Sequence, residues 1–464
     1  MKIFKNIFLK FKKLLNLVKS YPCKETFESL KFLPRAFSRL EKVILLVSSL
    51  VIIGLIIIIG INRWISSTEA LPENGGVFRE GVVGDSSNLD SQIARLVNGG
   101  LTKYDSNKNI IGDMAKSWDI NEGGKVYVFH LNSQFNSEDF ANQITSEGIW
   151  KDIEVSTPDL ATITFTFKQP FSPFLYTSTE PIFPYGPYKI TKESKSEVEL
   201  SARDDYYAGQ PYIDKIIFRF YPDQDALLKA AKRGEIDGFA TTVDAETISS
   251  FQKFEMKLPR QLTIFFNLSN KDLQDVNVRK ALKENSNPGK ALELRLVTSS
   301  NQKNVDVAKS IADKWGKNGV KVNLDIKDNV TLQKTVIPKR DYDVLLYGLD
   351  YGEDPDPYPF WHSSQISPPA GGDGKNLSNF KNVQADKLLE SARQEFDFKK
   401  RENEYAQFQQ ILNQEIPAFV VEQDTLYYQV SKDVKGIEKI IGSLESDRFL
   451  DVSKWYINTK RVKK

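Results

Sequence analysis

An acidic and aromatic segment between residues 348 and 364 offers the clearest chemistry in the chain. It reads GLDYGEDPDPYPFWHSS and carries three prolines within five positions, Pro355, Pro357 and Pro359. Proline fixes its own φ and keeps the preceding residue extended, so we expect the carboxylates and rings here to be held in place. Held acids beside apolar walls suit the capture of an amine-bearing ligand through a charge-assisted hydrogen bond. A rigid surface loop with solvated acids is the competing interpretation.

Catalytic alternatives find less support in the sequence. Asp354 and Asp356 have the spacing of the metal motif of sugar transferases, but no phosphate cradle lies nearby. The two histidines, His130 and His362, lack metal-site spacing, and the single cysteine, Cys23, lies early in the chain. No G-x-S-x-G or well-placed S-x-x-K motif occurs. A pair of carboxylates for glycoside hydrolysis is not excluded by the sequence, because 61 acidic residues offer many chance pairs. We therefore expect a binding protein rather than an enzyme, without metal or cofactor.

A long apolar segment precedes this region. Residues 43–61 run for 19 residues without a charged side chain, which at about 1.5 Å per residue nearly spans a hydrocarbon core of about 30 Å. A secretory signal peptide would have a shorter leader and a small-residue cleavage site. Here 42 residues come first, and Thr68-Glu69-Ala70 is a poor cleavage site. We expect an uncleaved transmembrane helix.

Charge sets the expected orientation of that helix. Residues 1–42 hold 11 Lys/Arg against 3 Asp/Glu, which predicts a cytoplasmic N-terminus and an extracytoplasmic C-terminal part in a single-pass protein of the cell membrane. The net charge of residues 1–42 is +8 and that of the whole chain is +2, so the net charge of the remaining residues is −6. A slightly acidic exported part argues against nucleic acid as a partner. With one cysteine no internal disulfide can form, so stability must come from the core.

Strand-like and helix-like runs alternate from residue 77 onward. Strands are expected at 77–83, 125–131, 162–167, 215–220, 262–267, 292–297 and 342–347, and helices at 224–233, 276–283, 304–317, 385–394 and 400–413. The best-marked helix, 304–317, ends at Asn318-Gly319 and lies between strands 292–297 and 320–326, which predicts a βαβ unit with parallel strands. We expect two mixed α/β lobes, because about 400 residues exceed one ordinary domain.

Several short segments, taken in order, resemble one known family. The early ones are LVNGGLTKY at 96–104, MAKSWDINEGGKVYVFHL at 114–131 and YGPYKI at 185–190. The later ones are DDYY at 204–207, GEID at 234–237, VRKAL at 278–282, DKLL at 386–389 and QQIL at 409–412. From about residue 77 to 437 the chain thus resembles the family 5 extracellular solute-binding proteins of ABC importers, the oligopeptide- and dipeptide-binding group.

This resemblance implies a two-lobed periplasmic-binding-protein-like clamp of type II, similar to the large cluster C group, preceded by one transmembrane helix. The expected plan begins with a basic cytoplasmic segment at 1–42, an anchor helix at 43–61 and a linker at 62–76. Lobe I then covers 77–265, with a reduced insertion near 135–180, and lobe II covers 266–430. Residues 431–464 are expected to return to lobe I.

The resemblance also implies a ligand site. In peptide-binding members, an aspartate of the Asp-Pro-rich loop pairs with the ligand's terminal ammonium, and main-chain edges hold the ligand as an added strand. By this resemblance Asp350 is the expected anchor and Asp354 the alternative. The other residues that it places at the ligand are Tyr347, Tyr351 and Trp361 from the same region, with Gly84, Asp85 and Asn88 from the facing lobe.

The implied function is the capture of short peptides and their delivery to the permease and ATPase subunits of an ABC transporter. A membrane-tethered sensor or scaffold is the alternative, because a 42-residue cytoplasmic arm exceeds what an anchor needs. The chain departs from the family pattern between Leu282 and Leu292, where a long helical stretch is replaced, and after Phe135-Asn136, where a region is reduced. These reductions leave the length of the ligand open.

Overall fold

The computed structural model describes residues 38–144, 153–352, 354, 356–366 and 374–464, with residues 9 and 12 of the basic segment. Most of the segment expected at 1–42 therefore lies outside the described residues. The chain divides into two compact units. The first comprises Met1–Glu73 with Thr459–Lys464, and the second comprises Asn74–Asn458.

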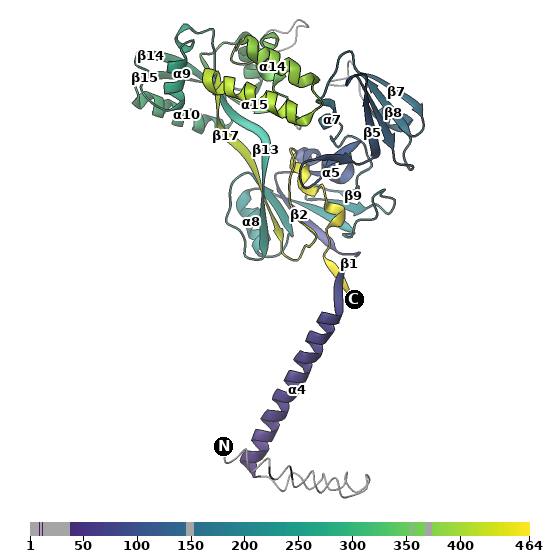
Figure 1. Cartoon of the computed structure of the whole chain (residues 1–464). Helices are drawn as coiled ribbons and strands as arrows, with labels where there is room; N and C mark the ends of the chain where they lie inside the picture. The colour runs from purple at the N-terminus through teal and green to yellow at the C-terminus, as the bar shows by residue number, and fades with distance from the viewer. Residues whose placement is uncertain are drawn as a thin grey trace. The chain divides into compact units, whose positions relative to one another are not determined.

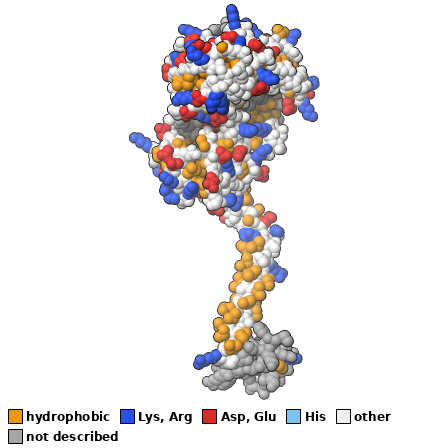
Figure 2. Space-filling view, turned by 90° about the vertical axis from the view of Figure 1, so that its left-hand side faces the viewer, with side chains coloured by type: hydrophobic (Ala, Val, Ile, Leu, Met, Phe, Trp, Pro, Cys, Tyr) orange, Lys and Arg blue, Asp and Glu red, His pale blue; other side chains and the backbone are white. Residues whose placement is uncertain are grey.

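The first unit contains one long apolar helix, α4 (Arg39–Ser67). Its stretch Leu46–Ser67 is long and apolar enough to cross a membrane, and none of that stretch is buried in the protein. Hydrophobic side chains cover the helix along its length (Figure 2). The helix extends beyond the expected end at Ile61, because the polar residues that follow continue its backbone hydrogen bonding to Ser67.

The linker expected at 62–76 is largely ordered, which corrects that boundary. After α4 the chain forms β1 (Thr68–Glu73), which pairs with β18 (Asn458–Lys463) in a two-stranded sheet. Arg461 donates hydrogen bonds to the Thr68 hydroxyl over 2.8 Å and to the Ile65 carbonyl over 3.0 Å. Its guanidinium also lies 4.9 Å from the centroid of the Trp64 ring. The composition of residues 62–76 suggested a linker. The partner strand β18 could not be recognised from this segment, because it is distant in the sequence.

The second unit is built on a ten-stranded sheet. Two long strands in the middle, β13 (Phe251–Phe266) and β17 (Ala418–Ser431), pair with each other along most of their length (Figure 1). On one side follow β16 (Val344–Asp350), β14 (Leu292–Ser299) and β15 (Val320–Lys327). On the other side follow β12 (Gly238–Thr241), β2 (Val77–Val83), β11 (Lys215–Tyr221), β10 (Glu197–Ala202) and β9 (Tyr188–Glu193).

The two long strands serve two hydrophobic cores. Met256 and Leu258 of β13 belong to the core of lobe I, whereas Leu262 and Ile264 further along belong to a core of lobe II. The pairing of β13 with β17 shifts register between Lys257 and Gln261. Pro259 lies in this gap, and proline has no backbone N–H to donate to a ladder. The connection between the lobes is therefore a pair of continuous strands with one weakened stretch.

Lobe II confirms the predicted βαβ unit. Strands β14 and β15 pair in parallel, with helix α10 (Gln302–Lys317) between them. The Asn301 side chain caps the start of the helix, and Gly319 takes a φ of +86° just after its end. Trp315 is buried, and its indole N–H donates to the Leu282 carbonyl over 2.9 Å. The other helices of this lobe are α9 (Val276–Lys283), α14 (Val383–Gln394) and α15 (Phe398–Glu415), with short turns α11 (Asn329–Thr331), α12 (Ile337–Lys339) and α13 (Tyr358–Trp361).

A separate four-stranded sheet carries a core of its own. Its order is β5 (Ala115–Asn121), β6 (Val126–Leu131), β8 (Thr162–Thr166) and β7 (Glu154–Asp159), with helices α6 (Ser137–Gln143) and α7 (Phe174–Thr177). Aromatic side chains dominate this core, and the rings of Tyr127 and Phe174 lie 5.0 Å apart. Strand β6 is an inner strand of this sheet, since both β5 and β8 pair with it. The reduced insertion expected near 135–180 stays a prediction.

Lobe I holds helices α5 (Leu89–Val97) and α8 (Gln224–Lys232) and the small hairpin of β3 (Thr102–Tyr104) and β4 (Ile110–Gly112). Late residues pack into the same core as the first strand, since the rings of Phe78 and Trp455 lie 5.8 Å apart.

A buried ion pair ties the late segment to strand β2. The Arg448 Nε lies 3.0 Å from a carboxylate oxygen of Glu80, and both side chains are fully buried. The Tyr428 hydroxyl donates to the other oxygen over 3.0 Å. Burial raises the pKa of Glu80 to about 7, although Arg448 opposes the shift. Glu80 therefore titrates near neutral pH in the folded protein.

This titration predicts a pH dependence of stability. Because the folded pKa of about 7 lies above the ordinary value of 4.5, the folded state holds the Glu80 proton more tightly than the unfolded state. The free energy of unfolding should therefore fall as pH rises through that window. In Glu80→Gln this component disappears, so the variant should lose less stability than the wild type between pH 4.5 and 7. Urea denaturation of the full chain in detergent at both pH values measures the difference, and equal losses would contradict the prediction.

Candidate functional site

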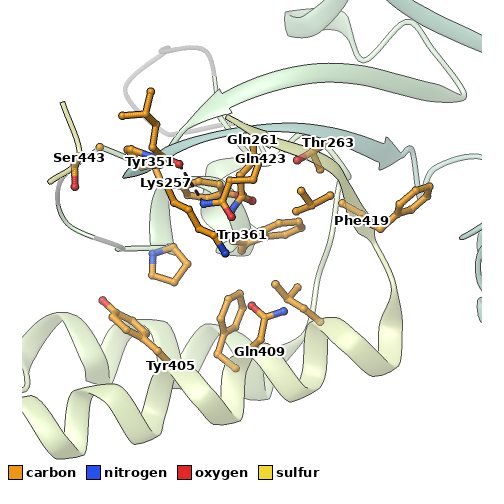
Figure 3. A pocket seen from close by; sticks show the side chains of 18 of the residues that line it. Lys257, Gln261, Thr263, Tyr351, Trp361, Tyr405, Gln409, Phe419, Gln423 and Ser443 are labelled. Carbon is orange, nitrogen blue, oxygen red and sulfur yellow. Dashed lines mark hydrogen bonds between the residues drawn. The ribbon is translucent and has the colours of Figure 1, made fainter. Parts of the chain in front are cut away.

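A cavity of about 950 Å³ lies where the two long strands of the sheet face helix α15. Its walls come from β13 and β17, from α15, from the loop after β16 and from residues 441–443 of the late segment. Figure 3 shows the strand residues on one side and the helix residues Tyr405 and Gln409 on the other. The volume falls in the range typical of small-ligand sites, about 300 to 1,000 Å³.

The strand side of the cavity follows from the alternation of side chains. Lys257, Gln261 and Thr263 of β13 line the cavity, whereas Met256, Leu262 and Ile264 of the same strand enter the cores. Successive residues of a strand point to opposite faces, so one sequence supplies both a core and a binding surface. Gln423 of β17 also lines the cavity and donates to the Leu258 carbonyl over 3.1 Å.

The opposite side is apolar and aromatic. Tyr405, Phe408 and Leu412 of α15 recur at helical spacing along one face and line the cavity with Gln409. Trp361, at the end of α13, lines it from lobe II and is buried. Helix α15 therefore contributes mainly aromatic and apolar side chains, together with the amides of Gln409 and Asn413.

The loop after β16 contributes Tyr351 and Gly352 to the lining. The Tyr351 ring lies 4.7 Å from the ring of Phe360, and burial raises the pKa of its phenol to about 12. Asp350 is the last residue of β16, is exposed, and accepts a hydrogen bond from the Gly352 N–H over 2.9 Å. Across the ladder it is the register partner of Arg260. The carboxylate expected to anchor a ligand thus adjoins the lining residues in sequence but is not itself among them.

Asp354 lies deeper in the loop and is already paired. The Arg401 Nη2 lies 2.9 Å from each of its two carboxylate oxygens, and the same nitrogen donates to the Tyr405 hydroxyl over 2.9 Å. Burial raises the pKa of Asp354 to about 6, and the attraction of Arg401 opposes that rise. An ammonium group that bound Asp354 would have to compete with a buried arginine.

Asp356 has a similar partner in Arg393, whose Nε lies 2.8 Å from one carboxylate oxygen. The Arg393 guanidinium stacks 4.1 Å from the centroid of the Tyr358 ring. These contacts fix the loop onto α14 and α15. The prolines indicated a held loop, but the two arginines that hold it were not recognised, because nothing local pairs them with residues about 40 positions away.

The remaining predicted residues lie outside the lining. Tyr347 is half-buried, and its hydroxyl accepts a hydrogen bond from the Gln333 side chain over 3.5 Å. Gly84 follows β2 with a φ of +108°, and Asp85 caps the short turn Ser86–Asn88 by accepting from the Ser87 N–H. Among the described lining residues, none comes from 84–88. Of the predicted site, the structure brings Tyr351 and Trp361 to the cavity.

The sequence reading missed the strand and helix residues that form most of the lining. Gln261 and Thr263 alternate with the apolar residues Leu262 and Ile264, which is the signal that could have identified them. The expected strand began only at residue 262, however, because the charged and proline residues before it obscured the pattern.

Comparison with known proteins shows what parts of the chain are similar to. The model of bacterial extracellular solute-binding proteins, family 5, middle, matches residues 109–285. The oligopeptide-binding protein AppA of Bacillus subtilis is 24% identical over 302 aligned positions, which cover 50% of this chain and 55% of AppA. A putative ABC transporter peptide-binding protein of Brucella ovis is 29% identical over 196 positions, which cover 32% of this chain and 37% of that protein. The chain thus spans about half or less of the length of these relatives.

Solved structures show the same fold. A putative peptide-binding protein AppA from Clostridium difficile superposes with a TM-score of 0.72 at 18% identity, covering 82% of this chain and all of that one. AppA of Bacillus subtilis in complex with a nonapeptide gives a TM-score of 0.62 at 18% identity, with 84% and 100% covered. The two-lobed α/β clamp expected from the sequence is confirmed.

The fold is therefore the one that these solved binding proteins share. Residues 109–285 are similar to the bacterial extracellular solute-binding proteins of family 5, and the relatives of the chain include oligopeptide- and dipeptide-binding proteins.

The pair of Asp354 and Arg401 predicts a cost in stability when it is broken. Arg401→Met leaves a buried carboxylate without its cation, so we expect a loss of about 3 to 5 kcal/mol in the free energy of unfolding. The double variant Asp354→Asn, Arg401→Met removes both charges and should recover part of that loss. Denaturant unfolding of the three proteins measures the coupling. Additive losses would show that the two side chains act independently.

Proposed function

We propose that this protein captures short peptides in the cavity beneath β13 and β17 and delivers them to the permease of an ABC transporter. The observation that carries the proposal is the cavity of about 950 Å³ with aromatic walls at the junction of the two lobes. The names of its relatives, oligopeptide- and dipeptide-binding proteins, support a peptide as the ligand. Since the lining comes from both lobes, a ligand there would favour the arrangement in which the lobes face each other.

The proposal assigns roles to the cavity walls. Trp361 and Tyr351 offer ring faces to apolar parts of a ligand, and Gln261 and Gln409 offer amide groups that can both donate and accept hydrogen bonds. These groups suit a peptide, whose backbone alternates N–H and C=O and whose side chains vary. Amides of this kind are compatible with several peptide sequences, because they hydrogen-bond to the peptide backbone rather than to one side chain.

Asp350 is the carboxylate that we propose for the ligand's terminal ammonium. It is exposed at the end of β16 beside the lining residue Tyr351, and its described hydrogen bond is to the local backbone of Gly352. Asp354 is the weaker candidate, because Arg401 occupies both of its oxygens. A charge-assisted hydrogen bond at Asp350 would orient the peptide in one direction along the cavity.

Peptide binding by Asp350 predicts a measurable loss in a variant. Isothermal titration of the full chain with pooled tripeptides should show saturable binding, and Asp350→Asn should weaken it about 10- to 100-fold, the worth of a hydrogen bond to a charged group. Asp313→Asn, exposed on α10, is the matched control and should leave the affinity unchanged. If Asp350→Asn binds the peptides with the same affinity as the wild type, Asp350 does not contact the ligand. If the wild type shows no heat of binding, the proposed function is contradicted.

We also propose that α4 anchors the protein in the cell membrane, with residues 1–42 in the cytoplasm. The support is one exposed apolar helix of sufficient length, Leu46–Ser67, preceded by a strongly basic segment. Delivery to a permease would then occur from a tethered receptor. Uptake of labelled peptide in cells with and without the protein separates transport from a sensing role, because a sensor would leave uptake unchanged.

The single cysteine provides a test of this orientation. A membrane-impermeant maleimide should label Cys23 only after the cells are lysed, because the basic segment is expected on the cytoplasmic side. Ser249→Cys, placed in the exported domain in a Cys23→Ser background, should be labelled in intact cells. Labelling of Cys23 in intact cells would reverse the proposed topology, and full-length protein in a carbonate-washed membrane pellet would support the uncleaved anchor.

A further inference from the structure

The cavity is unusual in the sign of its charges. Three lysines line it, Lys108 from the turn between β3 and β4, Lys257 from β13 and Lys283 from the last turn of α9. Among the described residues that line the cavity, none is an aspartate or a glutamate. A cavity with cations and no anion on its described walls has a positive potential, which attracts negatively charged ligands.

Lys257 has the most central position of the three. Its side chain reaches from the strand side into the cavity toward Trp361 (Figure 3). Its neighbour Met256 belongs to the core of lobe I, so alternation directs Lys257 to the opposite face, while Leu258 belongs to that core and also borders the cavity. No described residue forms an ion pair with Lys257, which leaves its ammonium available to a ligand.

Three acidic residues near the cavity have basic partners, whereas Asp350 at the end of β16 is exposed and bonds to the local backbone. Asp354 pairs with Arg401 over 2.9 Å, and Asp356 pairs with Arg393 over 2.8 Å. Glu445 of the late segment pairs with Arg260 over 2.5 Å. These pairs neutralise three carboxylates near the site and leave the charge of the lysines uncompensated within the described walls.

A buried polar atom on the same strand face also lacks a partner. The Thr263 hydroxyl has no hydrogen-bond partner among the described residues, although Thr263 lines the cavity and is 1% exposed. A buried hydroxyl without a partner costs free energy, and a ligand oxygen or N–H could satisfy it. It lies two residues beyond Gln261, on the face that also carries Lys257.

We propose that the cavity selects peptides of net negative charge, and that Lys257 contacts a side-chain carboxylate of the peptide. This inference rests on the proposed function, since it specifies which peptides the same site prefers. The ammonium of Lys257 supplies the counter-charge, and Thr263 and Gln261 hold the neighbouring polar groups. Basic peptides are disfavoured because the three lysines repel them.

Three tripeptides of matched size test the proposal by titration into the full chain in lipid nanodiscs: Ala-Glu-Ala, Ala-Gln-Ala and Ala-Lys-Ala. Glutamate and glutamine have the same shape and differ in charge. We expect Ala-Glu-Ala to bind at least about 10-fold more tightly than Ala-Gln-Ala, and Ala-Lys-Ala to bind most weakly. The advantage of Ala-Glu-Ala should shrink as salt rises, because screening weakens the attraction.

Variants assign the effect to one residue. Lys257→Met should abolish the difference in affinity between Ala-Glu-Ala and Ala-Gln-Ala, because lysine and methionine have similar length but only lysine is charged. Lys257→Arg should retain the preference. Lys309→Met, exposed on α10, is the matched control and should change none of the three affinities.

The possible outcomes separate the inference from the function on which it rests. Equal affinities for the three peptides would overturn the charge preference and leave peptide capture intact. A preference that persists in Lys257→Met would overturn the role of Lys257. No binding of any of the three peptides, or of pooled tripeptides, would overturn the proposed function and this inference with it.

Discussion

The structure of the second unit depends on one pair of strands. β13 and β17 hydrogen-bond to each other across both lobes, so the cores of the two lobes are joined through continuous backbone rather than through a flexible linker. Their register breaks around Pro259, where the ladder lacks a donor. Bending is least costly at such a gap, because fewer hydrogen bonds oppose it. The cavity lies beside this gap, so bending there would change the distance between its walls.

Paired and unpaired charges occupy different places around the cavity. Arginines behind the walls pair with the acids of the Asp-Pro-rich loop, and lysines on the walls stay without described partners. Two acids of this loop, Asp354 and Asp356, are therefore already neutralised by arginines. The same arginines also stack on rings, since Arg401 lies 5.1 Å from the centroid of the Tyr176 ring and 5.0 Å from that of Tyr405. The same arginine side chains thus neutralise the acids of the loop and hold the loop in place.

Periodicity predicted much of the fold. The βαβ unit around α10 was predicted correctly, because its apolar face, its Asn-Gly end and its flanking strands are local signals. The site was harder to predict, since its lining joins residues from β3 to the late segment that only the fold brings together. Asp354 illustrates the reason. Its type suggested a ligand contact, and its function in the structure depends on Arg401, 47 positions away, which no local pattern indicates.

The two-stranded sheet of β1 and β18 sets an order of assembly. The two strands lie at opposite ends of the described chain, and Arg461 joins β18 to Thr68 and to the end of α4. While the ribosome is still producing the residues between them, β1 has no strand to pair with. The segment just after α4 therefore becomes ordered last, although it is among the first to be synthesised. A polypeptide that is interrupted anywhere in between leaves β1 without its partner strand.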